Sequence, residues 1–406
     1  MSSATAVALQ RPAVVRSILL HGVAENLEVD VQPPLVHEKS YGDLLNASLV
    51  CRAWRDIAQE LLQKNLVFRR GKQLEAWLRS LPDDREEQRE NEIVVLYDPL
   101  PFKAQKEDGD GAKWSFDVVK RALSRVKATR TLCLLFMGQK EVPGEWLSTE
   151  GLKFLQILRI GSPFSTSDKP PSFSLSALAI DDSYPRLKRD WSSTFRLFAA
   201  SPSSSSLHSL DLSALPSFDK YLLDLVPFGA SLQALAIPAV ILSGDLWRFY
   251  PFAAACSKLH TLTIGSLRGV TPEILLAFPP TLSNISVNVV EGAPGELNEM
   301  SDTWGCLTRT LKELGGLKVF HIGEARKLST TQYEAVKQVA EEKGFILYIA
   351  RWLTCTDEEE LTETQIHLAS AQKPAQQAEV EAGGHETLTE TEQKAGKDQA
   401  EAHVEA

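Results

Sequence analysis

A six-residue apolar motif recurs along the middle of the chain and constrains the fold more than any other feature. Its form is Leu-x-x-Leu-x-Ile, with aliphatic or aromatic substitutions. Successive copies begin 20, 32, 25, 27, 23 and 35 residues apart, 27 on average. One copy could arise by chance, but seven in order indicate a repeated structural unit. Their apolar positions are Leu155, Leu158, Ile160; Leu175, Leu178, Ile180; Leu207, Leu210, Leu212; Leu232, Leu235, Ile237; Leu259, Leu262, Ile264; Leu282, Ile285, Val287; and Leu317, Phe320, Ile322.

Helical segments are predicted between the copies of the motif. Short apolar strands repeated every ~20–29 residues are typical of a leucine-rich solenoid, and strand–helix repeats place parallel strands in one sheet with helices outside. We therefore expect an α/β solenoid over residues 71–355, with an ordinary doubly wound α/β domain as the alternative. Helices are predicted at Trp191–Ala200, Asp245–Cys256, Thr271–Phe278, Trp304–Leu314 and Gln332–Lys343, further strands at Ile93–Leu96, Thr131–Leu135 and Phe345–Ile349, and a bulging loop at Ser201–Ser206.

The residue before the last apolar position of each motif should face away from the helices, because side chains alternate across a strand. These residues would line a concave surface that contacts a target protein, or they are simply solvated. The candidate target contacts are Arg159, Asp211, Thr263, Ser286 and His321, with the small Ala179 and Ala236 in the same position and Ser209, Thr261 and Asn284 beside them.

The region before residue 70 has a helical pattern. Pro12 suits the first turn of a helix, and apolar residues follow it at helical spacing. Asp43 is a candidate N-cap for a second amphipathic segment that contains Leu45, Leu49 and Trp54. Two short helices, or one bent helix, fit this segment.

This second segment resembles an F-box. The string Asp43-Leu44-Leu45, then Ser48-Leu49-Val50-Cys51, then Arg52, any residue and Trp54 matches the second half of that motif position by position. The following Leu61–Phe68 stretch is similar to the continuation found in fungal F-box proteins. The resemblance is specific over about 26 residues.

The resemblance implies a partner and a role. F-box domains dock on a Skp-family adaptor, which bridges them to a cullin-RING ubiquitin ligase, and a downstream repeat domain presents the target. One departure is Arg11, which stands before Pro12 where the family has leucine, and the loop before Asp43 is long. Helices that merely cap the first repeat are therefore the alternative. The implied adaptor-binding residues are Pro12, Ile18, Leu45, Leu49, Val50 and Trp54.

Charge is concentrated at the C-terminus. Thr356 to Ala406 holds 13 acidic and 3 basic residues, whereas the preceding 355 residues hold 40 of each sign. A neutral body offers no electrostatic footprint for nucleic acid or anionic lipid. The tail is poor in aromatic and apolar residues, which predicts disorder. The five cysteines show no CxxC spacing, which predicts a reducing compartment, the cytoplasm or nucleus. No apolar stretch approaches ~18 residues, so we expect no membrane span.

No catalytic motif, metal-ligand spacing or cofactor fingerprint is present in the sequence, so we expect a non-enzymatic interaction protein without cofactors. The predicted organisation is a disordered N-terminus (1–8), an F-box-like helical domain (9–70), the solenoid (71–355) and the acidic tail (356–406). The function expected is that of a substrate receptor for a ubiquitin ligase with an unknown target. The alternative is a repeat scaffold with a vestigial F-box.

Overall fold

The computed structural model describes residues 12–16, 46–81, 90–98, 114–136, 139–182, 188–238, 246–268, 273–291, 303–326 and 328–353. The chain divides into two compact units, Met1–Leu368 and Ala369–Ala406, and all described residues belong to the first. The predicted N-terminus (1–8), the acidic tail (356–406), Ile18 and Leu45 lie outside the described residues.

The described residues form one parallel sheet of eleven strands, arranged in chain order. Each strand pairs only with its neighbours in sequence, as a solenoid requires. The leucine-rich-repeat-like α/β solenoid predicted from the motif is therefore confirmed. The strands are β1 (Asn65–Phe68), β2 (Ile93–Asp98), β3 (Thr131–Phe136), β4 (Ile157–Ile160), β5 (Ala177–Ile180), β6 (Ser209–Asp211), β7 (Ala234–Ile237), β8 (Thr261–Arg268), β9 (Asn284–Glu291), β10 (Val319–Arg326) and β11 (Ile346–Leu353).

The central leucine of the motif forms an unbroken row across the sheet. From Leu66 in β1 to Leu347 in β11, each member of this row is the register partner of the next. All eleven side chains are buried in one continuous core. Each interior residue of the row thus lies between residues of the two neighbouring repeats. The row consists of Leu66, Val94, Leu132, Leu158, Leu178, Leu210, Leu235, Leu262, Ile285, Phe320 and Leu347.

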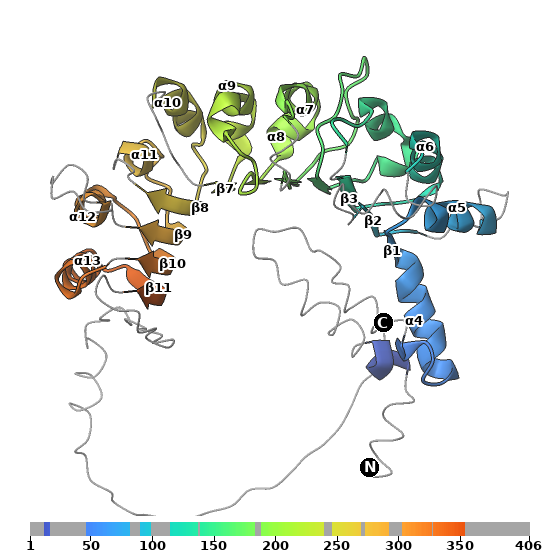
Figure 1. Ribbon diagram of the computed structural model, residues 1–406, viewed down its shortest axis with the longest axis horizontal. Coiled ribbons are helices and arrows are strands. Elements are labelled where there is room, and N and C mark those ends of the chain that lie inside the picture. Colours follow the sequence, from blue (N-terminus) through green and yellow to red (C-terminus); the bar gives the residue numbers. More distant parts are fainter. Residues whose placement is uncertain are drawn as a thin grey trace, which may run out of the picture. The chain divides into compact units, whose positions relative to one another are not determined.

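Among the described residues, helices lie on the outer face of the sheet, and the strands form the other face, which we call the concave face (Figure 1). The helices predicted between motifs are confirmed at α7 and at α10 to α13. The α-helices are α4 (Arg52–Lys64), α5 (Gly71–Ser80), α6 (Phe116–Arg125), α7 (Ser192–Ala199), α8 (Ser203–Ser206), α9 (Leu222–Leu225), α10 (Leu246–Ala255), α11 (Glu273–Leu276), α12 (Thr303–Glu313) and α13 (Thr330–Lys343). Short 3-10 turns are η3 (Gly144–Ser148), η4 (Glu150–Leu152), η5 (Phe218–Tyr221) and η6 (Val226–Ser231).

The last helix shows how local sequence sets an element's limits. The Ser329 hydroxyl caps the start of α13 by accepting a hydrogen bond from the backbone N–H of Gln332. The side-chain oxygen of Gln332 in turn accepts a hydrogen bond from the backbone N–H of Ser329. Gly344 ends the helix in the left-handed conformation, which a residue without a Cβ adopts at little cost. The chain then turns directly into β11.

Two elements differ from the sequence prediction. Asn65–Phe68 is the first strand of the sheet, so the sheet begins before residue 71, because Leu66 and Phe68 are buried in the main core. Ser201–Ser206 is not a bulging loop. It contains α8, whose Ser203 is buried and accepts a hydrogen bond from the backbone N–H of Leu175 (3.1 Å), so serine hydroxyls satisfy the backbone of the preceding repeat.

A buried ion pair fastens the middle of the solenoid. The Arg189 guanidinium, with no exposed side-chain surface, donates to the Asp182 carboxylate (2.6 Å) and to the backbone carbonyl of Gln139 (3.1 Å). The Trp191 indole N–H donates to the second Asp182 oxygen at 3.0 Å. The network therefore links segments that follow β3 and β5 to the start of α7.

We expect Asp182→Ala to lower the free energy of unfolding by ~3–5 kcal/mol, because it removes a buried carboxylate that pairs with the buried Arg189 cation. The matched control is Glu145→Ala, which removes an exposed ion pair with Lys120 and should cost less than ~1 kcal/mol. Urea unfolding followed by circular dichroism measures both. Equal effects would show that the Asp182 carboxylate is not needed to balance Arg189.

Candidate functional site

The N-terminal helical module has a core of its own, separate from that of the solenoid. It combines residues 12–16, residues 46–51 and α4, and Arg16 pairs with Glu60 across it. Trp54 and Leu62 pack on this core and are half-buried. The members of the core are Val15, Ala47, Ile57, Ala58 and Leu61.

Two large apolar side chains of the module remain exposed. Leu49 is 76% exposed and Val50 is 63% exposed, more than any other large apolar residue in the described part of the chain. They lie on a turn fixed by backbone bonds from Leu49 to Asn46 (3.0 Å) and from Val50 to Ala47 (3.2 Å). Arg55 of α4 also donates to the carbonyl of Ser48 at 3.2 Å. The exposed pair is thus presented by a hydrogen-bonded turn at the start of α4.

The structure places the implied adaptor-binding residues as follows. Leu49 and Val50 are consecutive residues on this turn. Trp54 follows in the first turn of α4, and its side chain packs against the module's own core. Pro12 is exposed at the start of the short helix 12–16. Among the described members, Pro12, Leu49 and Val50 are exposed, whereas Trp54 is half-buried.

The helical module joins the solenoid without a linker, because α4 ends at Lys64 and β1 begins at Asn65. The Asn91 side chain donates to the carbonyl of Gln63 at 2.8 Å, and Lys64 pairs with Glu92 at 3.4 Å. These contacts tie the end of α4 to the segment that leads into β2.

On the concave face, the five predicted target contacts fall in one register row. This row, which we call the central concave row, crosses all eleven strands. Its members are Val67, Val95, Cys133, Arg159, Ala179, Asp211, Ala236, Thr263, Ser286, His321 and Tyr348.

Between β2 and β7, the side chains of the central concave row are largely buried. Four of these residues are buried although they are on the face of the sheet that points away from the helices: Val95, Cys133, Ala179 and Ala236. Arg159 is engaged with Asp181 through an ion pair of 2.7 Å, and both side chains are largely buried.

Asp211 is buried as well. Its carboxylate accepts hydrogen bonds from the backbone N–H (2.9 Å) and the hydroxyl (2.6 Å) of Ser213. Arg159 and Asp211 therefore serve internal contacts, whichever partner the protein has.

The last part of the row is half-exposed. Thr263, Ser286 and His321 lie on consecutive strands, and the Ser286 hydroxyl is 3.0 Å from Nδ1 of His321. The imidazole stacks on the Tyr348 ring, with centroids 4.8 Å apart and planes 20° from parallel. Tyr348 was not among the sequence candidates. The alternation rule could have found it, because it lies between buried Leu347 and Ile349.

A charged group adjoins this part of the row. Glu324 accepts two hydrogen bonds from Arg326 (3.0 and 3.3 Å), and its register partner in β11 is Arg351. The hydrogen bonds from Arg326, together with the charges of both arginines, hold the pKa of Glu324 below its usual value, although partial burial opposes this shift.

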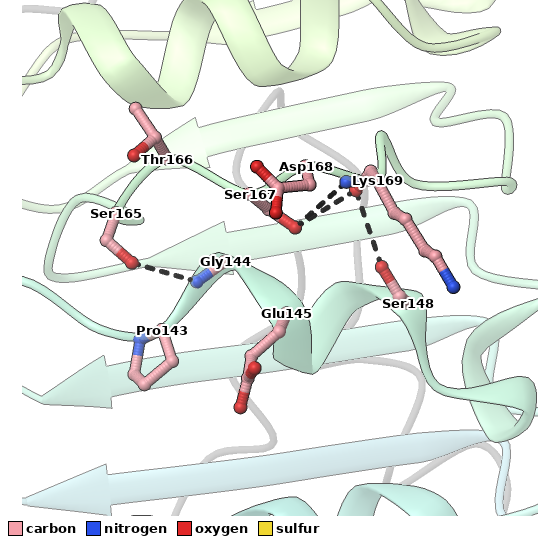
Figure 2. Close-up of a pocket in the computed structure, with 9 residues that line it drawn as sticks. All are labelled: Pro143, Gly144, Glu145, Ser148, Ser165, Thr166, Ser167, Asp168 and Lys169. Atoms are coloured by element: carbon pink, nitrogen blue, oxygen red, sulfur yellow. Dashed lines mark hydrogen bonds between the residues drawn. The ribbon is translucent and has the colours of Figure 1, made fainter.

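A hollow of about 510 Å³ lies among the connections between strands (Figure 2). Ser165 accepts a hydrogen bond from the backbone N–H of Gly144 at 3.3 Å, and the hydroxyl of Ser148 donates to the carbonyl of Lys169 at 3.4 Å. Two serine hydroxyls at the hollow thus join the η3 turn to the segment that follows β4. The residues around the hollow are Pro143, Gly144, Glu145, Ser148, Ser165, Thr166, Ser167, Asp168 and Lys169.

Within the described ranges, no three His, Cys, Asp or Glu side chains gather closely enough to hold a metal ion.

Comparison with known proteins identifies no family. No family model matches the chain, and no curated protein does. Among solved structures, the leucine-rich repeat-containing protein LegL7 from Legionella pneumophila is similar over 66% of this chain and 88% of its own, at 15% identity and a TM-score of 0.34. A likeness this weak adds nothing to the evidence of the strand register. No helix of the described residues is long and apolar enough to cross a membrane.

Cysteine reactivity tests whether the central concave row is buried at β3. Burial raises the pKa of the Cys133 thiol to about 12, although the Arg159 charge lowers it slightly, whereas Cys51 is exposed. Because the thiolate is the reactive form, we expect iodoacetamide at pH 8 to alkylate Cys51 and to leave Cys133 unmodified in the folded protein. Peptide mass spectrometry measures this, with urea-unfolded protein as the control. Equal rates at the two cysteines would show that the face is open at β3.

Proposed function

We propose that the protein is a substrate receptor of a Skp-cullin-F-box type ubiquitin ligase. In this role the turn before α4 binds a Skp-family adaptor, and the repeat domain binds the protein to be ubiquitinated. The observation that supports this role is the exposure of Leu49 and Val50 on a hydrogen-bonded turn. The same two residues belong to the string that resembles an F-box.

The energetics favour a partner at this turn. Covering a leucine or valine side chain stabilises a complex by roughly 1.5–3 kcal/mol. Trp54, one turn along, adds an aromatic ring that is already positioned by the module's core. An apolar pair beside a fixed aromatic anchor matches the composition of the centre of a protein interface, which is rich in aromatic residues and poor in charge.

The connection to the solenoid fits the same role. A receptor has to hold its target at a defined place relative to the ligase, and α4 continues into β1 without a linker. The contacts of Asn91 and Lys64 at this junction restrain it further. The alternative function is a repeat scaffold whose N-terminal helices bind no adaptor. Arg11, in place of the leucine of the family, favours that alternative.

We expect the double variant Leu49→Asp, Val50→Asp to lose capture of a purified Skp-family adaptor by the full-length chain. Two charges on the apolar contact should weaken the complex at least a hundredfold, which corresponds to ~3 kcal/mol. Both positions are exposed, so the fold should be kept. Isothermal titration calorimetry measures the affinity.

The matched control is Leu223→Asp, which places a charge on an exposed leucine of α9, in the solenoid. It should bind the adaptor as the wild type does. If the wild type itself fails to bind while circular dichroism shows it folded, the scaffold function replaces the ligase role.

A further inference from the structure

The exposed apolar turn before α4 has a charged border. Leu49 and Val50 lie on the turn, and two exposed arginines, Arg52 and Arg55, follow within the first four residues of α4. Large apolar side chains that remain in water beside positive charge form a surface of mixed character. Its two parts ask for different groups on a partner.

Arg55 is held against the turn. Its Nε–H donates to the carbonyl of Ser48 at 3.2 Å, and Ser48 directly precedes Leu49 in the chain. The guanidinium therefore lies beside the apolar pair. Within the described part of the chain, its two terminal nitrogens form no hydrogen bond and no ion pair. An arginine whose position is already restrained loses less conformational freedom on binding, so its remaining N–H groups are prepared for an acceptor.

The acidic residues of α4 do not neutralise this border. Glu60 pairs with Arg16 across the core of the module. Asp56 is exposed, and among the described residues it forms an ion pair with neither Arg52 nor Arg55. Two arginines and one aspartate therefore leave an excess of one positive charge on the exposed start of α4.

We propose that Arg55 pairs with a carboxylate that borders an apolar groove of the partner, while Leu49 and Val50 enter that groove. This inference rests on the proposed function in taking the partner to be the Skp-family adaptor. An apolar centre with a polar rim is the usual anatomy of a protein interface, and complementary rim charges speed association and disfavour wrong partners. The two terminal nitrogens of Arg55 match the two oxygens of a carboxylate, and Arg52 adds attraction at longer range.

The test compares the affinity of the full-length chain for the purified adaptor in ~0.1 M and ~1 M sodium chloride, where charges are screened beyond ~10 Å and ~3 Å. Isothermal titration calorimetry measures the affinity. We expect Arg55→Glu to weaken binding roughly tenfold or more at the lower salt concentration and only about threefold at the higher one. Arg55→Lys, which keeps the charge, should retain the salt dependence of the wild type.

The matched control is Arg121→Glu, which reverses an exposed arginine of α6, in the solenoid. It should leave the affinity unchanged at both salt concentrations. Circular dichroism verifies that each variant is folded. The salt dependence separates recognition from a structural role, because loss of the bond from Arg55 to Ser48 alone would weaken binding by the same factor at both concentrations.

Three results would overturn the inference. The first is adaptor binding that depends on Leu49 and Val50 but not on Arg55 or on salt, and this result leaves the ligase role standing. The second is an equal loss at both salt concentrations in Arg55→Glu, which would assign Arg55 to the fold of the turn. The third is the absence of adaptor binding to the folded wild-type chain, which would overturn the proposed function as well.

Discussion

The row of apolar residues from Leu66 to Leu347 is the interaction on which the rest of the structure depends. Each interior member of the row lies between its register partners on the two neighbouring strands, so the whole sheet shares this core. A single strand–helix unit of this kind could not bury enough apolar area to offset its loss of conformational freedom. The repeat unit therefore exists only within the array, and the concave rows are a consequence of the same register.

The sequence predicted those parts of the fold that follow from this row. A leucine at the fourth motif position and an aliphatic residue at the sixth have to face the core, so the residue between them has to face away. That alternation places five residues in one row, namely Arg159, Asp211, Thr263, Ser286 and His321. It did not predict which of them stay accessible. Asp211 binds Ser213 and Arg159 binds Asp181, and such pairings depend on loop geometry that periodicity does not encode.

Other features escaped prediction for similar reasons. The strand Asn65–Phe68 is short, directly follows a helix and lies within the stretch that resembles an F-box, so its apolar residues looked helical. The network of Asp182, Arg189 and Trp191 joins residues from separate loops, and nothing in their spacing distinguishes them from solvated charges. The adaptor-facing residues were proposed from resemblance. The structure adds that Leu49 and Val50 are exposed while Trp54 is shared with the module's core.

The two candidate surfaces arise from opposite departures from the repeat. At the N-terminus, Leu49 and Val50 are exposed on the turn before α4, which suits binding through apolar burial. In the last strands, extra length and an offset before Ala325 create a second row that no shorter strand can carry. There, the strands carry charged side chains and the stacked rings of His321 and Tyr348. A receptor of the proposed kind, which binds an adaptor and a target at once, would benefit from this separation, because neither surface chemistry can substitute for the other.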